Sequence, residues 1–248
     1  MKAMIFAAGL GTRLRPLTDA RPKALVEVGG KPLLGILTDK LRQAGITDIT
    51  VNVHHFPDQI IQYLQGSCIS AHISDERYSL LDTGGGLRKA RPFLEGGGPF
   101  LTHNVDILSN LDFTALPGMY RPGSVATLIV SDRPSSRRLL FDDDMRLRGW
   151  LNTQTGEVRS PYPGLKPEDC RSYAFSGIQI ISDRIFPLME TRPEEKFSII
   201  DFYLSEAARQ PIYGYAPKGL EVLDVGKRDS IAVAASVLER YSQELAHD

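Results

Sequence analysis

The chain has 248 residues, of which 42% are hydrophobic and 24% are charged, and its formal net charge is -1. This is the composition of an ordinary globular protein that can bury a full core. The near-neutral balance argues against a dedicated nucleic-acid-binding protein, which carries a basic surplus. The apolar stretch at residues 3–8 is too short to cross a membrane or to serve as a signal peptide.

The first half of the chain alternates apolar runs with helical patterns. We expect strands at residues 1–7, 46–53, 69–73 and 99–102, and helices at residues 31–45, 56–66 and 87–93. A turn of three glycines, residues 84–86, is expected before the last of these helices. Alternating strands and helices are typical of βαβ units, so we predict an α/β fold with three layers, a Rossmann-like and mostly parallel sheet flanked by helices.

The second half is less regular. We expect strands at residues 124–130, 173–181, 211–216 and 221–225, and helices at residues 198–210 and 229–245. The last helix has an apolar stripe through Ile231, Ala235, Leu238 and Tyr241 or Leu245. We predict a single domain over residues 1–248, in which residues 131–172 form an irregular elaboration of hairpins and loops that covers a substrate.

A glycine-rich loop with Gly9, Gly11 and Arg13 follows the first strand, and Lys23 lies just beyond it. Glycine lets backbone N–H groups approach a phosphate closely, Arg adds a planar charged fork, and Lys adds a compact charge. The loop lacks the P-loop pattern, and Leu14 stands where the dinucleotide fingerprint needs glycine. The loop therefore predicts a small polyanionic ligand and disfavours a hydride-transfer enzyme.

The run AAGLGTRLRPLTDARPKALVEVGGKPLL resembles the signature of the sugar-1-phosphate nucleotidyltransferases. The blocks DTGGGLRKA, NVD, FSGIQII, FSIIDFYL and LDVGKRDS extend the resemblance over nearly the whole chain. It implies the nucleotide-diphospho-sugar transferase fold and the attack of a sugar 1-phosphate on the α-phosphorus of a nucleoside triphosphate, with release of pyrophosphate. Val105 and Lys227 differ from the residues that are usual in this family. The resemblance also implies a metal site, and these two differences leave its shape open.

The resemblance also implies roles for individual residues. Arg13 would hold the β- and γ-phosphates and the leaving pyrophosphate, and Lys23 would steady the α-phosphate, so both are expected to be catalytic. The glycines at 84 and 85 are expected to leave room for a flat base and to expose backbone groups to its edge. The expected nucleotide-binding residues are Ala8, Gly9, Gly11, Thr12, Arg13, Lys23, Asp82, Thr83, Gly84 and Gly85.

Asp106 and Asp224 each end an apolar strand, which would place both carboxylates at one edge of a parallel sheet. They match the metal positions of the family, so Mg²⁺ is the expected cofactor. Aspartates at strand ends also cap helices, which is the structural alternative. The expected sugar-binding residues are Asn104, Asn152, Glu157, Ser176 and Gly177.

Other single residues are less specific. Trp150 either stacks on a sugar ring or packs inside a hairpin, and His54 and His55 are expected to be structural because neither has a partner at ligand spacing. The two cysteines, Cys68 and Cys170, are far apart, and we expect them to be reduced, as in a cytoplasmic protein.

Several functions stay open at this point. The compact length and the TGGG segment are most similar to the N-acetylmuramate 1-phosphate uridylyltransferases, which favours UTP as the nucleotide. Mannose or heptose 1-phosphate guanylyltransferases are the alternative, as is a phosphocholine cytidylyltransferase, for which Tyr162, Tyr173 and Phe175 would supply aromatic contacts. A non-catalytic nucleotide-binding regulatory subunit is disfavoured because it has no need of two metal carboxylates.

The expected partners are a nucleoside triphosphate and a sugar 1-phosphate. We expect neither nucleic acid nor a membrane as a partner, and no appended hexapeptide-repeat acetyltransferase domain. The sequence leaves a homo-oligomer open.

Overall fold

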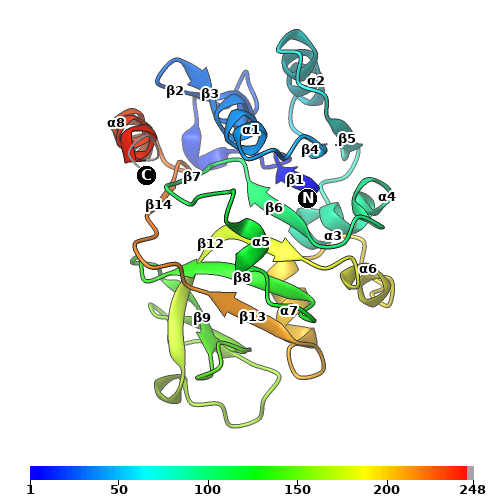
Figure 1. Ribbon diagram of the computed structural model, residues 1–248, viewed down its shortest axis with the longest axis vertical. Helices are drawn as coiled ribbons and strands as arrows, with labels where there is room; N and C mark the ends of the chain where they lie inside the picture. The colour runs from blue at the N-terminus through cyan, green and yellow to red at the C-terminus, as the bar shows by residue number, and fades with distance from the viewer. Residues whose placement is uncertain (245–248) are drawn as a thin grey trace.

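The computed structural model describes residues 1–244, which form a mixed sheet flanked by helices (Figure 1). The described residues contain a ten-stranded sheet in the order β11-β10-β9-β12-β6-β1-β4-β5, with β8 beside β12 and β13 beside β8. Its strands are β1 (Ala3–Phe6), β4 (Ile49–Val53), β5 (His72–Asp75), β6 (Phe100–Asn104), β8 (Ala126–Ser131), β9 (Arg137–Phe141), β10 (Leu147–Asn152), β11 (Val158–Arg159), β12 (Arg171–Ile181) and β13 (Ile212–Tyr215).

Helices connect these strands. They are α1 (Leu33–Gln43), α2 (Pro57–Gly66), α3 (Asp82–Lys89), α4 (Arg91–Leu94), α5 (Leu116–Met119), α6 (Ile185–Met189), α7 (Ile199–Glu206) and α8 (Arg228–Glu244). None of the helices within residues 1–244 is long and apolar enough to cross a membrane. Leu245, which the sequence analysis placed on the stripe of the last helix, lies outside the described residues; Ile231, Ala235 and Leu238 of that stripe pack on the core.

Two apolar cores cover the two faces of the sheet, because successive residues of a strand point to opposite faces. Ala3 and Ile5 of β1 belong to a cluster with residues of α1, α2 and α8. Met4, between them, belongs to a second cluster with residues of α3, α4, α6 and α7. The predicted three-layer α/β fold is therefore confirmed.

The sheet is parallel where the chain alternates strands with helices. β1 pairs in parallel with β4 and β6, and β4 pairs in parallel with β5. From β12 onward the pairing is mostly antiparallel: β12 runs against β6, β8 and β9, and β10 runs against β9 and β11. The hairpins expected within residues 131–172 thus continue the sheet through β9, β10 and β11.

A small two-stranded sheet joins two parts of the chain that are far apart in sequence. β7 (Ile107–Ser109) pairs antiparallel with β14 (Val222–Asp224), and Ile107 lies opposite Asp224. The backbone N–H of Val225 donates to the carbonyl of Asp106 at 2.8 Å. This pairing brings the loop after β6 against the segment that leads into α8. A further pair of short strands, β2 (Glu27–Val28) and β3 (Lys31–Pro32), precedes α1.

The prediction of a glycine turn at residues 84–86 is wrong. All three glycines are buried inside α3, which begins at Asp82, and α4 follows it directly. The segment between α6 and α7 packs so closely against them that a larger residue would collide: a Cβ on Gly84 would lie 2.3 Å from the ring of Phe197. Tertiary contact therefore overrides the low helix propensity of glycine here.

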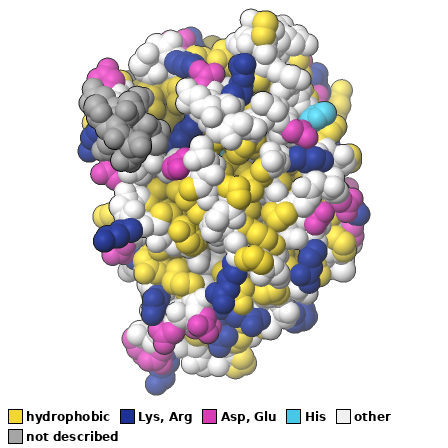
Figure 2. Space-filling model, in the orientation of Figure 1, with side chains coloured by type: hydrophobic (Ala, Val, Ile, Leu, Met, Phe, Trp, Pro, Cys, Tyr) yellow, Lys and Arg dark blue, Asp and Glu magenta, His cyan; other side chains and the backbone are white. Residues whose placement is uncertain are grey.

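On the face shown in Figure 2, acidic and basic side chains are interspersed around a central apolar area. No single sign of charge dominates this face. This mixed distribution on the face shown agrees with the near-neutral composition of the chain.

Lys40 of α1 generates a prediction about pH and stability. Its Nζ donates to the carbonyl of Ser109 in β7 at 2.7 Å and lies 4.6 Å from the centre of the Phe113 ring. Burial lowers the pKa of Lys40 to about 8, with a smaller opposing effect from Asp112. The unfolded chain, in which this pKa is 10.5, therefore binds more protons between pH 8 and 10.5, so the free energy of unfolding rises with pH over that range.

Lys40→Met removes the titrating group and keeps an apolar stem. The free energy of unfolding of the wild type should therefore rise, relative to that of the variant, by about 2–3 kcal/mol between about pH 7 and pH 10.5. Urea denaturation of both proteins across this range measures the difference. A difference that stays constant with pH would contradict the lowered pKa.

Candidate active site

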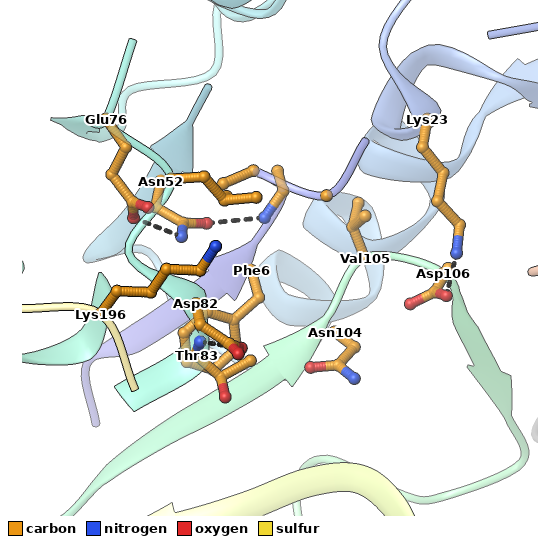
Figure 3. A pocket seen from close by; sticks show the side chains of 14 residues that line it. Phe6, Lys23, Asn52, Glu76, Asp82, Thr83, Asn104, Val105, Asp106 and Lys196 are labelled. Carbon is orange, nitrogen blue, oxygen red and sulfur yellow. Dashed lines mark hydrogen bonds and ion pairs between the residues drawn. The ribbon is translucent and has the colours of Figure 1, made fainter. Parts of the chain in front are cut away.

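The smaller of two neighbouring pockets lies at the carboxyl ends of the parallel strands (Figure 3). Its volume is about 370 Å³. Open α/β sheets bind ligands at this edge, where loops rather than side chains of the strands form the surface. The lining residues are Phe6, Ala7, Ala8, Gly9, Lys23, Asn52, Glu76, Leu80, Asp82, Thr83, Asn104, Val105, Asp106 and Lys196.

A buried polar pair forms one wall of this smaller pocket. Asn52 of β4 accepts a hydrogen bond from the backbone N–H of Ala7 at 2.7 Å and donates to Glu76 at 2.7 Å. Glu76 also accepts from the N–H of Leu81 at 3.1 Å. Burial raises the pKa of Glu76, although these hydrogen bonds and Lys89 oppose the shift. The pair fixes the end of β1 relative to the loop before α3.

The sequence analysis missed both members of this pair. Asn52 is an amide within the apolar strand TVNV, and Glu76 is the first residue after β5. A buried amide needs a hydrogen-bond partner, so the position of Asn52 in a buried strand was the available signal. Lys196 was also missed; Figure 3 shows it reaching into the pocket from the segment between α6 and α7.

The glycine-rich loop is held in a compact turn. Gly11 has a φ of 64°, and a Cβ there would lie 2.8 Å from Cγ2 of Thr18. The buried hydroxyl of Thr18 donates to the carbonyl of Gly11 at 2.8 Å. Only glycine adopts this backbone without strain at such close range. The turn directs Arg13 outward, while the neighbouring Leu14 is fully buried.

Four charged residues from distant segments meet where this loop approaches the β7–β14 pair. Lys23, 9% exposed, forms an ion pair with Oδ2 of Asp106. A Cβ on Gly226 would lie 2.5 Å from Oδ1 of Asp224 and 2.7 Å from Nη2 of Arg13, so both groups lie against the backbone of Gly226. Oδ1 of Asp224 is buried and accepts no hydrogen bond within the described part of the chain.

The two aspartates come together by a different route from the one expected. Asp106 follows β6 of the main sheet, but Asp224 ends β14, which is not in that sheet. The antiparallel pairing of β14 with β7 places the residues side by side. The expectation that both lie at the edge of one parallel sheet is therefore corrected for Asp224.

The larger pocket adjoins the smaller one, since Asp82 lines both. Its volume is about 1080 Å³. Two of the predicted sugar-binding residues, Asn152 and Glu157, line it. The full lining is Arg13, Asp82, Arg133, Ser135, Ser136, Arg137, Leu139, Trp150, Asn152, Glu157, Arg159, Phe175, Ser198, Ile200, Asp201 and Asp224.

Trp150 is nearly buried, and the guanidinium of Arg159 lies 4.0 Å from its ring centre. It packs within the hairpin and also contributes to the wall of the larger pocket. The three aromatic residues considered for a quaternary ammonium do not gather there. Phe175 lines this pocket, whereas the hydroxyl of Tyr162 donates to the carbonyl of Ala207, and the ring of Tyr173 lies tilted against that of Phe141.

Some predicted residues are not on either pocket. Ser176 is fully buried, and its hydroxyl donates to the carbonyl of Ile129 at 2.6 Å. Gly177, at a φ of 78°, packs against Asn104, whose Nδ2 would lie 2.9 Å from a Cβ there. Gly177 therefore shapes the position of Asn104. Thr12 is exposed in the loop and lines neither pocket.

The glycines of α3 support the pocket and do not present free N–H groups to it. The N–H groups of Gly84 and Gly85 both donate to the carbonyl of Phe197, at 2.9 and 3.3 Å. Asp82 and Thr83, at the start of the same helix, do line the smaller pocket. The hydroxyl of Thr83 accepts from the N–H of Ile199, which ties the pocket to the start of α7.

The histidines and cysteines have structural surroundings. His54 and His55 contact the carbonyls of Glu76 and Thr18, at 2.7 and 3.2 Å. Cys68 and Cys170 are free thiols. Residues 1–244 contain no group of three or more His, Cys, Asp or Glu side chains arranged around one metal ion. Two carboxylates beside two cations suit a different task, the binding of phosphates together with a hydrated divalent ion.

Comparison with known proteins agrees with this chemistry. The model of the nucleotidyl transferase family matches residues 2–129. The N-acetylmuramate alpha-1-phosphate uridylyltransferase of Caulobacter vibrioides is 34% identical over 233 residues, 88% of this chain and 89% of that protein. The protein of the same name from Neisseria meningitidis serogroup B is 49% identical over 118 residues, 46% of this chain and 51% of that protein.

Among solved structures, a putative glucose-1-phosphate thymidylyltransferase from Bacillus anthracis has the same fold. The TM-score is 0.78 at 19% sequence identity, and the match covers 96% of this chain and 94% of the other.

The contact between α3 and the segment before α7 predicts the effect of Gly85→Ala. A Cβ at this position would lie 2.2 Å from the carbonyl oxygen of Glu195, which is backbone and cannot rotate away. We expect a loss of about 1–3 kcal/mol in the free energy of unfolding, measured by urea denaturation. Gly66→Ala in α2 is the control, because no atom lies within 4 Å of its Cβ position. Equal stability of the two variants would contradict the packing described for α3.

Proposed function

The chain belongs to the sugar-1-phosphate nucleotidyltransferases of the nucleotidyl transferase family, and within that family we propose that it couples UTP to N-acetylmuramate 1-phosphate. The choice of substrates follows the two named relatives. An oxygen of the sugar phosphate attacks the α-phosphorus of UTP, the bond from that phosphorus to the oxygen bridging the α- and β-phosphates breaks, and pyrophosphate leaves. The product is the uridine diphosphate sugar.

One observation carries the proposal: two pockets of different size adjoin at Asp82, and each is lined by one of the two cations and one of the two aspartates. Lys23 and Asp106 line the smaller pocket, and Arg13 and Asp224 line the larger one. Two anionic substrates repel one another, so a catalyst of this reaction needs fixed cations and alignment more than it needs a nucleophile. The arrangement supports a nucleotide in the smaller pocket and a sugar in the larger.

We propose Arg13 as the ligand of the β- and γ-phosphates and Lys23 as the ligand of the α-phosphate. Arg13 is exposed on the glycine-rich loop, where its fork is free to bind two oxygens. Lys23 is almost buried, and its ion pair with Asp106 keeps its ammonium at the wall of the smaller pocket. Charge that develops on the α-phosphate would therefore meet a cation already in place.

Asp106 and Asp224 fit a divalent metal ion. The buried, unpartnered Oδ1 of Asp224 needs a positive partner, because a buried carboxylate oxygen without one is costly. Mg²⁺ is commonly held by one or two carboxylates and by substrate phosphates, with water completing the shell. Held by Asp106 and Asp224, it would supply positive charge that offsets the repulsion between the two substrates.

For the base we propose the end of the smaller pocket formed by Ala8, Gly9, Asp82 and Thr83, next to the Asn52–Glu76 pair. For the sugar we propose contacts with Asn152 and Glu157, which line the larger pocket, and with Asn104, which lines the smaller one. Residues 1–248 would act as a single domain. A cytoplasmic location is proposed because nucleoside triphosphates are cytoplasmic substrates.

Pyrophosphate release tests this proposal. UTP, GTP, CTP and dTTP are each combined with N-acetylmuramate, N-acetylglucosamine, mannose and heptose 1-phosphates and with phosphocholine, in the presence of Mg²⁺. We expect the highest kcat/KM with UTP and N-acetylmuramate 1-phosphate. A clear preference for another pair would replace the substrates, and no release with any pair despite nucleotide binding would indicate a regulatory subunit.

Asp106→Asn and Asp224→Asn keep the size of each side chain and remove its charge. We expect each to lower kcat by at least about 100-fold, since each removes a ligand of the charged reacting groups. Asp143→Asn, at a highly exposed carboxylate whose one ion pair within residues 1–244 is with Arg171, is the matched control. Unchanged kcat in both pocket variants would contradict the assigned role of the aspartates.

A further inference from the structure

We infer that the larger pocket contains a second anion-binding subsite, formed by Arg133 and Arg137, that takes a carboxylate carried by the sugar of the sugar 1-phosphate. The inference rests on the proposed function for the position of the sugar in this pocket. It adds that Arg133 and Arg137 are the residues that select a sugar bearing a carboxylate.

Arg133 lies in the connection between β8 and β9, and Arg137 is the first residue of β9. Four of the five residues from 133 to 137 line the larger pocket: Arg133, Ser135, Ser136 and Arg137. The hydroxyl of Ser135 donates to the carbonyl of Arg137 at 2.9 Å and accepts from its N–H at 3.2 Å. The segment is thus held in a local turn that keeps both arginines on the pocket.

Arg133 is anchored and is not a freely moving surface side chain. Its Nη2 donates to the carbonyl of Phe175 in β12 at 3.1 Å, and its Nε is buried. The carbonyl of Arg133 accepts from Nη1 of Arg138 at 3.3 Å. Since backbone and guanidinium are both tied down, little conformational freedom remains to be lost when a ligand binds.

Neither Arg133 nor Arg137 forms an ion pair within the described residues, although other arginines nearby do. Arg159, which also lines the pocket, lies 2.6 Å from Asp201 and 3.8 Å from Glu157. Arg138, just outside it, lies 2.7 Å from Asp132. Glu157 and Asp201, the acidic residues in this part of the pocket, therefore already form ion pairs with Arg159. Arg133 and Arg137 remain as an uncompensated positive charge facing the cavity.

This positive charge is separate from the phosphate-binding groups. Arg13 and Asp224 come from the glycine-rich loop and from β14, whereas Arg133 lies in the β8–β9 connection and Arg137 is the first residue of β9. The pocket that joins them has roughly three times the volume of the nucleotide pocket. A sugar 1-phosphate that spans it would carry its phosphate toward the smaller pocket, where the nucleotide is proposed to bind, and a second anion near Arg133.

A carboxylate is the anion that this subsite fits, because a planar guanidinium binds two carboxylate oxygens with parallel hydrogen bonds. A sugar that bears an acidic ether substituent, such as the lactyl group of N-acetylmuramate, supplies it. A neutral sugar leaves both arginines without a partner, and sites built for a polar group discriminate strongly against analogues that lack it.

The test compares acceptors that differ only at this group. Wild type, Arg133→Gln, Arg137→Gln and the double variant are assayed with saturating UTP and Mg²⁺. The acceptors are N-acetylmuramate 1-phosphate, the same molecule with its carboxylate converted to a carboxamide, and N-acetylglucosamine 1-phosphate. The carboxamide separates the effect of charge from that of shape.

For the wild type we expect kcat/KM to be at least about tenfold higher with the carboxylate than with the carboxamide. In the double variant the carboxylate substrate should lose about ten- to 100-fold, chiefly through KM, while the two neutral acceptors change by less than about twofold. Arg171→Gln, at an exposed arginine paired with Asp143 outside the pocket, is the matched control and should resemble the wild type. An unchanged KM for UTP reports an intact nucleotide pocket.

The inference is overturned if the preference for the carboxylate survives in the double variant, or if all three acceptors lose activity equally. Failure of the proposed function has a different signature. If the wild type releases pyrophosphate only with another sugar phosphate, glucuronate 1-phosphate and glucose 1-phosphate replace the first two acceptors. A preference for glucuronate that the double variant loses would still support the subsite, and a wild type that rejects every carboxylate-bearing sugar would refute it.

Discussion

The structure of the active site depends on bringing four charges from distant parts of the chain to one place. Arg13 and Lys23 come with the glycine-rich loop, Asp106 follows β6, and Asp224 arrives almost at the end of the chain. The antiparallel pairing of β7 with β14 and the hydrogen bond from the N–H of Val225 to the carbonyl of Asp106 hold the backbones of the two aspartates next to each other. Lys23 forms an ion pair with Asp106, whereas Oδ1 of Asp224 has no hydrogen-bond partner within the described residues.

In the proposed function, the two substrates would meet different kinds of scaffold. The nucleotide side is formed by the ends of parallel strands and by α3, which buried glycines lock against the segment before α7. The acceptor side is formed by the hairpins β9 to β11 and the connection before them. Rigid strand ends can hold the reacting phosphate in a fixed position. The loops between antiparallel strands can change in sequence without moving that phosphate. In the proposed function, the chemistry and the choice of acceptor would therefore depend on different segments of the chain.

Much of this was predictable from the sequence. Apolar runs and glycine or proline boundaries were enough to locate most strands and helices, and the glycine-rich loop and the two aspartates stood out by their residue types. Three features were not predictable. The glycines of α3 are helical because of a tertiary contact, Ser176 points inward because β12 shifts register between Phe175 and Ile178, and Arg133 and Arg137 lie in a polar stretch with no periodicity. Each depends on a neighbour far away in the chain.

The central claim is that Asp106 and Asp224 jointly hold a divalent ion beside the nucleotide phosphates. A crystal structure with Mn²⁺ and a UTP analogue that cannot be cleaved between the α- and β-phosphates, with anomalous scattering recorded for manganese, tests it most directly. The account predicts an anomalous peak within about 2–2.5 Å of an oxygen of each carboxylate and of a phosphate oxygen. A peak bound only by phosphates and water, away from both aspartates, would contradict it.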